Sequence, residues 1–189
     1  MNNSVPALAP GSLVERKMNV LPDLIIMQIK QAVTPSEIEE LRHMFREYAT
    51  FLNVDLCFQG VEEELAHLPG KYAPPSGMLL MGLSLGEVAG CVALRELESG
   101  ICEMKRLFVR LRFRSLGLGR QLTAAILAEA RGLGYYLMRL DTLNHLTGAI
   151  RLYEQLGLHP IGPYYENPLP GVTYWELDLT ARQHGIANS

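Results

Sequence analysis

The sequence is poor in features that would place it in several common classes of protein. It has three cysteines among 189 residues, Cys57, Cys91 and Cys102, and their spacing is not typical of a metal site. An odd number of thiols with such spacing is typical of free, buried cysteines in a reducing compartment. The sequence therefore predicts neither a disulfide framework nor a metal.

Long hydrophobic runs and an excess of positive charge are also missing. No apolar run approaches the roughly 20 residues of a membrane-spanning helix, and the N-terminus lacks the pattern of a signal peptide. The 17 Lys and Arg against 20 Asp and Glu give a formal net charge of −3, whereas a general nucleic-acid binder is usually more basic. We therefore expect a cytoplasmic protein that engages neither nucleic acid nor a membrane.

Enough apolar residues are present for one well-packed domain. Hydrophobic residues make up 48% of the chain and charged residues 20%, as in ordinary globular proteins. We expect the domain at residues 23–180, between a flexible tail at 1–22 and a frayed tail at 181–189. The apolar periodicity predicts the order β-α-α-β-β-β-α-β-α-β-β, which indicates an α/β fold with one mixed sheet and helices on its faces.

The individual elements follow from periodicity and from turn residues. Strands are predicted at residues 24–33, 77–84, 87–96, 101–109, 135–142, 158–161 and 172–179. Helices are predicted at about 35–52, 61–68 and 146–156, and one more follows the turn at 110–119 and ends before the cap at 132–134. The first helix has a capping box, in which Thr34 and Glu37 satisfy each other's backbone N–H groups.

The most informative stretch runs from residue 101 to 131 and reads as a strand, a basic turn and a helix. Six of the 17 basic residues lie between positions 105 and 120, and the turn closes with Gly117-Leu118-Gly119. A helix N-terminus offers unpaired N–H groups and partial positive charge, and glycine lets an anion approach the backbone. The stretch therefore predicts a binding site for a small phosphate-bearing ligand.

Two motifs in this region and beyond it point to a family. Arg114-Ser115-Leu116-Gly117-Leu118-Gly119 has the form Arg-x-x-Gly-x-Gly after a strand, and Ala149, Tyr153 and Gly157 form Ala-x-x-x-Tyr-x-x-x-Gly on a helix. With the order of elements, they make residues 24–179 resemble the GNAT superfamily of acyl-CoA N-acyltransferases, within a largely uncharacterised bacterial-type subgroup. The other common phosphate-binding loops and dinucleotide motifs are absent from the sequence.

The resemblance implies a site for acetyl-CoA at a mostly antiparallel sheet that splays apart. The pyrophosphate would bind to the backbone N–H groups of Arg114, Ser115, Leu116, Gly117, Leu118, Gly119 and Arg120, with added charge from Arg112, Arg114 and Arg120. Pantetheine would bond to the backbone at Leu107 and Val109, and a backbone N–H of the same strand would polarise the thioester carbonyl.

The resemblance also implies two catalytic side chains, Glu103 and Tyr153. Glu103 matches a general base or a residue that positions water; the alternative is an ion pair with Lys105 or a neighbour. Strict strand alternation would put Leu107 and Val109 on the same face as Glu103. Tyr153 matches a general acid, or else is a core tyrosine. A Cys102 nucleophile is disfavoured, because no histidine lies near it in sequence and the family transfers the acetyl group directly in a ternary complex.

The sequence says less about the identity of the acceptor. The loop at residues 162–171 holds Tyr164, Tyr165, Glu166 and Asn167, which either recognise a small polar amine or pack against the last strand. We expect an N-acetyltransferase for the primary amine of a small molecule or amino-acid-like acceptor. An acetyltransferase for protein N-termini or lysines, and an acyl-CoA sensor without turnover, are the alternatives. A homodimer stays open.

Overall fold

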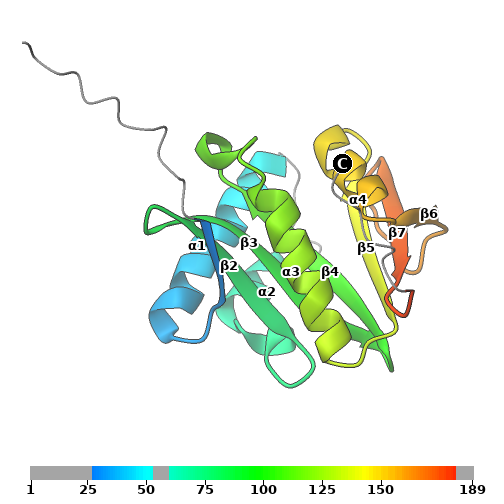
Figure 1. Cartoon of the computed structure of the whole chain (residues 1–189), viewed down its shortest axis with the longest axis horizontal. Helices are drawn as coiled ribbons and strands as arrows, with labels where there is room; N and C mark the ends of the chain where they lie inside the picture. The colour runs from blue at the N-terminus through cyan, green and yellow to red at the C-terminus, as the bar shows by residue number, and fades with distance from the viewer. Residues whose placement is uncertain (1–26, 53–59, 182–189) are drawn as a thin grey trace, which may run out of the picture.

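The computed structural model of the chain describes residues 27–52 and 60–181. Cys57, the predicted N-terminal tail and all but the first residue of the predicted C-terminal tail lie outside these ranges. Seven strands form one sheet in the order β1-β2-β3-β4-β5-β7-β6 (Figure 1). Their bounds are β1 Met27–Gln31, β2 Met78–Ser84, β3 Glu87–Glu98, β4 Ile101–Val109, β5 Leu137–Leu143, β6 His159–Ile161 and β7 Val172–Asp178. Strands β4 and β5 are parallel and the other described neighbours are antiparallel, which confirms the predicted mixed sheet.

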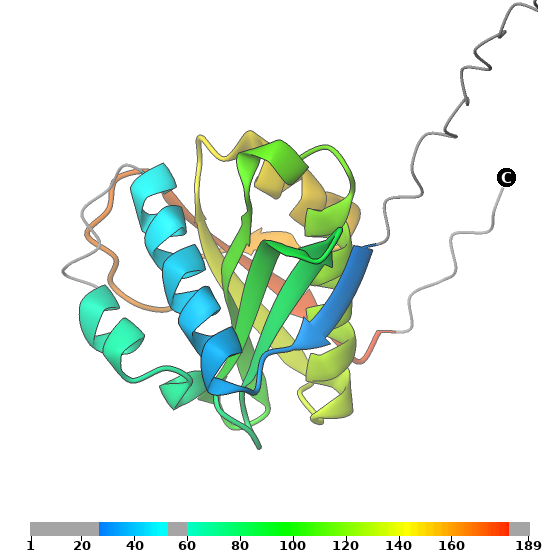
Figure 2. The same ribbon diagram turned by 90° about the vertical axis from the view of Figure 1, so that its left-hand side faces the viewer.

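Helices cover both faces of this sheet. Helices α1 (Pro35–Leu52) and α2 (Val61–Ala66) lie on one face, and α3 (Leu118–Gly132) and α4 (Thr147–Gln155) lie on the other (Figure 2). The predicted capping box is present, because the Thr34 N–H donates to Glu37 at 2.9 Å and the Glu37 N–H donates to the Thr34 hydroxyl at 3.3 Å. Two short 3₁₀ turns, Gly70–Tyr72 and Leu111–Phe113, complete the helical elements of the described chain.

Each face of the sheet has its own hydrophobic core. The α3 and α4 side buries residues of the sheet against helix residues such as Leu122, Ile126 and Tyr153. The α1 and α2 side buries Leu41, Phe45 and neighbouring apolar residues. Alternate residues along β2 and β3 point into the two cores, so both faces of the central strands are sealed from water.

A β-bulge interrupts the register between β3 and β4. Cys91 pairs with Phe108 but Ala93 pairs with Lys105, so β4 holds one extra residue there, and Arg106 has a φ of 58°. The expected alternation is therefore wrong beyond this point. Leu107 and Val109 pack against the core on the α3 side, while Glu103 lies on the opposite face of the strand from Cys102 and Met104 of that core.

Strands β4 and β5 separate soon after they meet. Their pairing covers Ile101 with Leu137, Cys102 with Met138 and Glu103 with Arg139, and no pairing follows in the remaining length of either strand. The backbone of β4 beyond Glu103 therefore has no strand beside it on the β5 side. This is the splayed sheet that the family resemblance implies, and it positions the candidate site between the diverging strand ends.

Candidate active site

The turn after β4 presents backbone N–H groups at the start of α3. Ser115 and Gly117 both have positive φ, 65° and 81°. The first backbone hydrogen bond into the helix runs from the Gln121 N–H to the Gly117 carbonyl at 3.1 Å. The N–H groups of Leu118, Gly119 and Arg120 consequently have no helical partner and point out at the positive end of the helix dipole.

Arg114 is held differently from the sequence expectation. Its backbone N–H donates to the Leu111 carbonyl at 3.2 Å, so it is not one of the N–H groups left unpaired in the turn. Its side chain folds back, with Nε donating to the Val109 carbonyl at 3.0 Å and the guanidinium 4.2 Å from the centre of the Phe51 ring. Arg114 therefore braces the end of β4 as well as adding positive charge there.

Most of the local basic cluster is already paired with acidic side chains. Arg110 bonds to Glu47 and Glu40 on α1, and Arg112 pairs with Glu87. Arg106 and Lys105 also pair with carboxylates, as described below. Within the described ranges, Arg114 and Arg120 have no acidic partner, and Arg120 donates to Gln155 at 3.0 Å. The groups of this turn that are suited to an anion are thus its N–H groups and these two arginines.

A cavity of about 400 Å³ runs along this turn and the end of β4. The predicted cofactor residues Leu107, Val109, Arg114, Ser115, Gly117, Leu118 and Gly119 all line it, together with residues of α1 and α4. Leu116 and Arg120 do not line the cavity. A Cβ added at Gly119 would lie 3.8 Å from the Val109 side chain, so a larger residue would narrow the space beside the strand.

An inner pocket of about 60 Å³ continues from this cavity between the splayed strands. The two share four lining residues, Tyr48, Leu107, Leu146 and Ala149. Leu146 therefore places an apolar side chain at the junction of the two cavities. The polar residues that line the inner pocket include Lys105, Arg106, Asp141 and Tyr153.

Tyr153 lies on α4 one turn after Ala149 and is 5% exposed. Burial raises the pKa of its phenol, so the hydroxyl stays protonated at neutral pH. The Tyr153 hydroxyl has no hydrogen-bond partner among the described residues, and Tyr153 lines the inner pocket. A protonated hydroxyl without a protein partner at this place has the chemistry of a proton donor.

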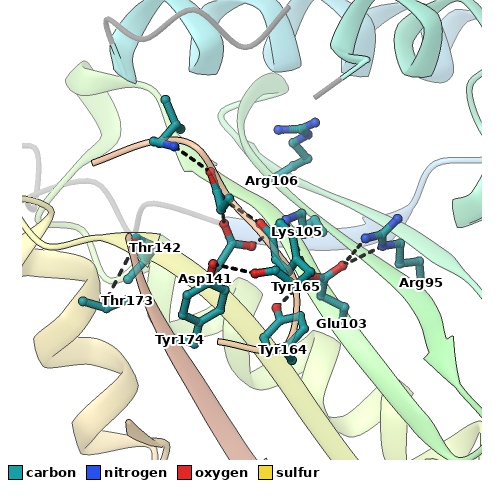
Figure 3. Close-up of polar contacts among 12 residues, drawn as sticks. Arg95, Glu103, Lys105, Arg106, Asp141, Thr142, Tyr164, Tyr165, Thr173 and Tyr174 are labelled. Carbon is teal, nitrogen blue, oxygen red and sulfur yellow. Dashed lines mark hydrogen bonds and ion pairs between the residues drawn. The ribbon is translucent and has the colours of Figure 1, made fainter. Parts of the chain in front are cut away.

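Glu103 is fully buried, with both carboxylate oxygens engaged (Figure 3). Arg95 contacts Oε2 through Nε and a terminal nitrogen, each at 2.6 Å, and the Tyr164 hydroxyl donates to Oε1 at 2.7 Å. Lys105 lies 3.5 Å from Oε1. Glu103 does not line the inner pocket. This geometry favours the ion-pair and positioning alternatives over direct removal of a proton from a bound acceptor.

Asp141 is the carboxylate that does line the inner pocket, and the sequence reading missed it. Lys105 donates to its Oδ1 at 2.5 Å and Asn167 lies 3.5 Å from its Oδ2. Burial and the nearby Asp141 carboxylate raise the pKa of Tyr165, which therefore remains a neutral phenol. The available signal was a charged residue inside a strand predicted to be buried, since such residues are rarely buried unless paired or functional.

The loop at residues 162–171 joins this charged network. Tyr164 bonds to Glu103, and the Asn167 amide donates to the Tyr165 hydroxyl at 2.9 Å. The rings of Tyr164, Tyr165 and Tyr174 pack in tilted and edge-to-face arrangements, with 5.2 to 5.6 Å between their centres. The loop thus both packs against β7 and supplies polar groups beside the inner pocket, so the two alternatives from the sequence are not exclusive.

The described cysteines are free and inert. Cys91 and Cys102 are buried and unpaired, as predicted. Burial raises the pKa of the Cys102 thiol to about 12, so the nucleophilic thiolate is scarce at neutral pH. This agrees with the expectation that Cys102 is not a nucleophile.

Three comparisons with known proteins agree on one family. The family model described as "Acetyltransferase (GNAT) family" matches residues 38–158. An uncharacterised N-acetyltransferase of Schizosaccharomyces pombe is 39% identical over 156 residues, which cover 82% of this chain and 96% of the relative. The structure of Salmonella typhimurium yncA with its cofactor acetyl-CoA has a TM-score of 0.64 at 18% identity, covering 86% and 99% of the two chains. A GNAT-family acetyltransferase of Staphylococcus aureus has a TM-score of 0.68 at 17% identity, covering 82% and 99%.

The fold, the glycine turn and these matches together define the class. The chain belongs to the GNAT acetyltransferase family and is an acyltransferase. In the part of the chain that the structure describes, no helix is long and apolar enough to cross a membrane, and no group of three potential metal-ligating side chains gathers.

Proposed function

We propose that this protein transfers the acetyl group of acetyl-CoA to the primary amine of a small acceptor by direct attack in a ternary complex. The observation that carries the proposal is the meeting of two cavities at Leu107 and Ala149. The outer cavity has the backbone donors suited to a pyrophosphate, and the inner one has Tyr153 and a set of polar side chains. A cofactor lying in the outer cavity would extend its thioester to the junction.

The donor side of the proposed reaction uses mainly backbone groups. The pyrophosphate binds the unpaired N–H groups of Leu118, Gly119 and Arg120, with Ser115, Leu116 and Gly117 shaping the turn and Arg114 beside it. Pantetheine runs along β4 at Leu107 and Val109. A backbone N–H at the bulge donates to the thioester oxygen, where negative charge develops in the transition state. The left-handed conformation of Arg106 is the kind of backbone strain that clusters at such sites.

Proton transfers complete the proposed mechanism. The amine nitrogen attacks the thioester carbonyl carbon and loses a proton, and the carbon–sulfur bond then breaks to release the CoA thiolate. Tyr153 donates its phenolic proton to that sulfur. Asp141 is the carboxylate placed to take the proton of the amine, directly or through water. Glu103 acts as a positioning residue that holds Lys105 and Tyr164 around it.

The small inner pocket favours a small acceptor over a protein segment. A screen that measures free CoA release with small amines, peptides and proteins tests this. Release with small amines is the expected result, and release with peptides alone would replace the proposal by protein acetylation. Tight acetyl-CoA binding with no release across the whole panel would indicate a sensor. A cytoplasmic location stays a prediction from the sequence, and a homodimer stays open.

A further inference from the structure

Arg106 is a buried cation whose hydrogen-bonding capacity is only partly used. It is 8% exposed, and its Nε donates to Glu64 Oε1 on α2 at 2.9 Å. Neither terminal nitrogen of its guanidinium has an acceptor among the described residues. Among the described residues, every side-chain nitrogen or oxygen that is sealed from solvent has a hydrogen-bond partner. Because the two terminal nitrogens of Arg106 have none, they are not sealed from solvent. Arg106 lines the inner pocket.

The charge around Arg106 is not balanced by its own neighbours. Glu64 is shared, because Lys71 lies 2.6 Å from its Oε2 and the Tyr72 hydroxyl donates to its Oε1 at 2.9 Å. Two cations thus face a single carboxylate. The neighbouring group of Arg95, Lys105, Glu103 and Asp141 holds two cations and two anions and is neutral as a whole. The group of Arg106, Lys71 and Glu64, which borders the inner pocket at Arg106, consequently has one positive charge in excess.

We propose that the acceptor carries a carboxylate, bound by the free terminal nitrogens of Arg106 while its amine faces Asp141. This inference rests on the proposed function and narrows its acceptor to α-amino acids or compact relatives. A guanidinium fork matches a carboxylate in two parallel hydrogen bonds and is stronger than a neutral contact. The bound carboxylate would also neutralise the excess charge, and burial would strengthen the pair by excluding water.

The pocket's dimensions fit this assignment. A cavity of about 60 Å³ admits only a few water-sized groups, which suits the carboxylate and α-carbon of an amino acid rather than a large ring. Arg106 lies on β4 and Asp141 on β5, the two strands that separate beyond Glu103 and Arg139. An acceptor with its two charged ends on these strands would hold its nitrogen between them, beside the junction with the outer cavity.

The test compares acids with their amides. Glycine, alanine and methionine are each assayed beside the corresponding amino acid amide, with kcat/KM measured by CoA release. In parallel, each compound is titrated by calorimetry into the protein saturated with CoA, which reports binding without turnover. We expect the acids to be preferred about 10- to 100-fold, the size of a charge-assisted hydrogen bond that is lost in the amide. Arg106→Gln should remove that preference, and Arg106→Lys should restore part of it.

Controls separate a lost site from a lost fold. Each Arg106 variant must bind acetyl-CoA with the wild-type Kd, and Arg46→Gln, an exposed arginine on α1, should leave the acid preference intact. Equal use of acids and amides, or an Arg106→Gln effect equal on both, would overturn the carboxylate site while leaving amine acetylation in place. Acid-selective binding without CoA release would keep the carboxylate site and overturn the proposed function. Absence of both binding preference and turnover would overturn the two together.

Discussion

The two halves of the site are built on different principles. The proposed donor half, from Val109 to Arg120, offers backbone N–H groups in one continuous segment, and its glycines matter for their conformation. The proposed acceptor half gathers charged side chains from α2, β3, β4 and β5, most of which are already paired with one another, and a tyrosine from the loop before β7. The first half can bind a ligand common to a whole family, whereas the second half can vary one side chain at a time.

The largest effect is expected from the donor half, where Gly117→Glu should weaken acetyl-CoA binding by at least about 100-fold. The new carboxylate repels the pyrophosphate and competes for the N–H groups, each worth a charge-assisted hydrogen bond. The φ of 81° adds strain for any residue with a Cβ. Calorimetry measures the Kd, and Gly132→Glu at the far end of α3, where the Cβ position is open, is the matched control. An unchanged affinity would remove the site assignment.

A buried charge should matter most for stability in the acceptor half. Burial alone would raise the pKa of Glu64, but Arg106 and Lys71 hold it at about 2, against an ordinary value of 4.5. Glu64→Gln should therefore cost about 3 kcal/mol of unfolding free energy at pH 7, because Arg106 is left buried and unpaired.

The same pKa fixes how that difference changes with pH. A carboxylate with a lowered folded pKa stabilises the protein above pH 4.5 and loses that contribution as the pH falls towards 2. Urea unfolding of wild type and Glu64→Gln should show a gap at pH 7 that narrows at pH 3. A gap that is independent of pH would mean that packing, and not charge, causes the loss.

Tyr153→Phe tests the link between the halves. Loss of a general acid should lower kcat about 100-fold and leave the Kd of acetyl-CoA unchanged, since only the hydroxyl is removed. Burial raises the pKa of Tyr153, so the acid should stay protonated and cause no fall in kcat between pH 7 and about 10. Tyr136→Phe on the exposed surface is the control. A wild-type kcat at saturating substrates would mean that Tyr153 only packs in the core and is not the general acid.

The smallest expected effect distinguishes the roles of the two carboxylates of the acceptor half, Glu103 and Asp141. Glu103→Gln should lower kcat/KM about tenfold through its neighbours, with the shape of the pH–rate profile unchanged. Asp141→Asn should instead alter the limb of that profile that reports the base. If Glu103→Gln changes the limb and Asp141→Asn does not, the base is Glu103, as the family resemblance implied.

The elements of the fold were predictable where periodicity and turn residues agree. Strand β4 was predicted with its observed bounds, and a helix was predicted to follow the glycine turn, since a strand, a glycine turn and an amphipathic helix are local patterns. Helix α2 ends at Ala66, two residues before the predicted end, as the approach of Pro69 disfavours the helical conformation. The bulge at Arg106 was not predicted, because the extra residue is visible only against the partner strand.

The sequence by itself determined the proposed donor half, since residues 114–120 are contiguous and the unpaired N–H groups of Leu118, Gly119 and Arg120 follow from local conformation. Tertiary structure alone decided which charges meet. Glu103 lies 61 positions from Tyr164, Lys105 lies 36 from Asp141 and Arg106 lies 42 from Glu64, and each contact depends on sheet order and on the bulge. A buried charge reveals its role through the partner that neutralises it, and that partner is chosen by the packing of distant segments.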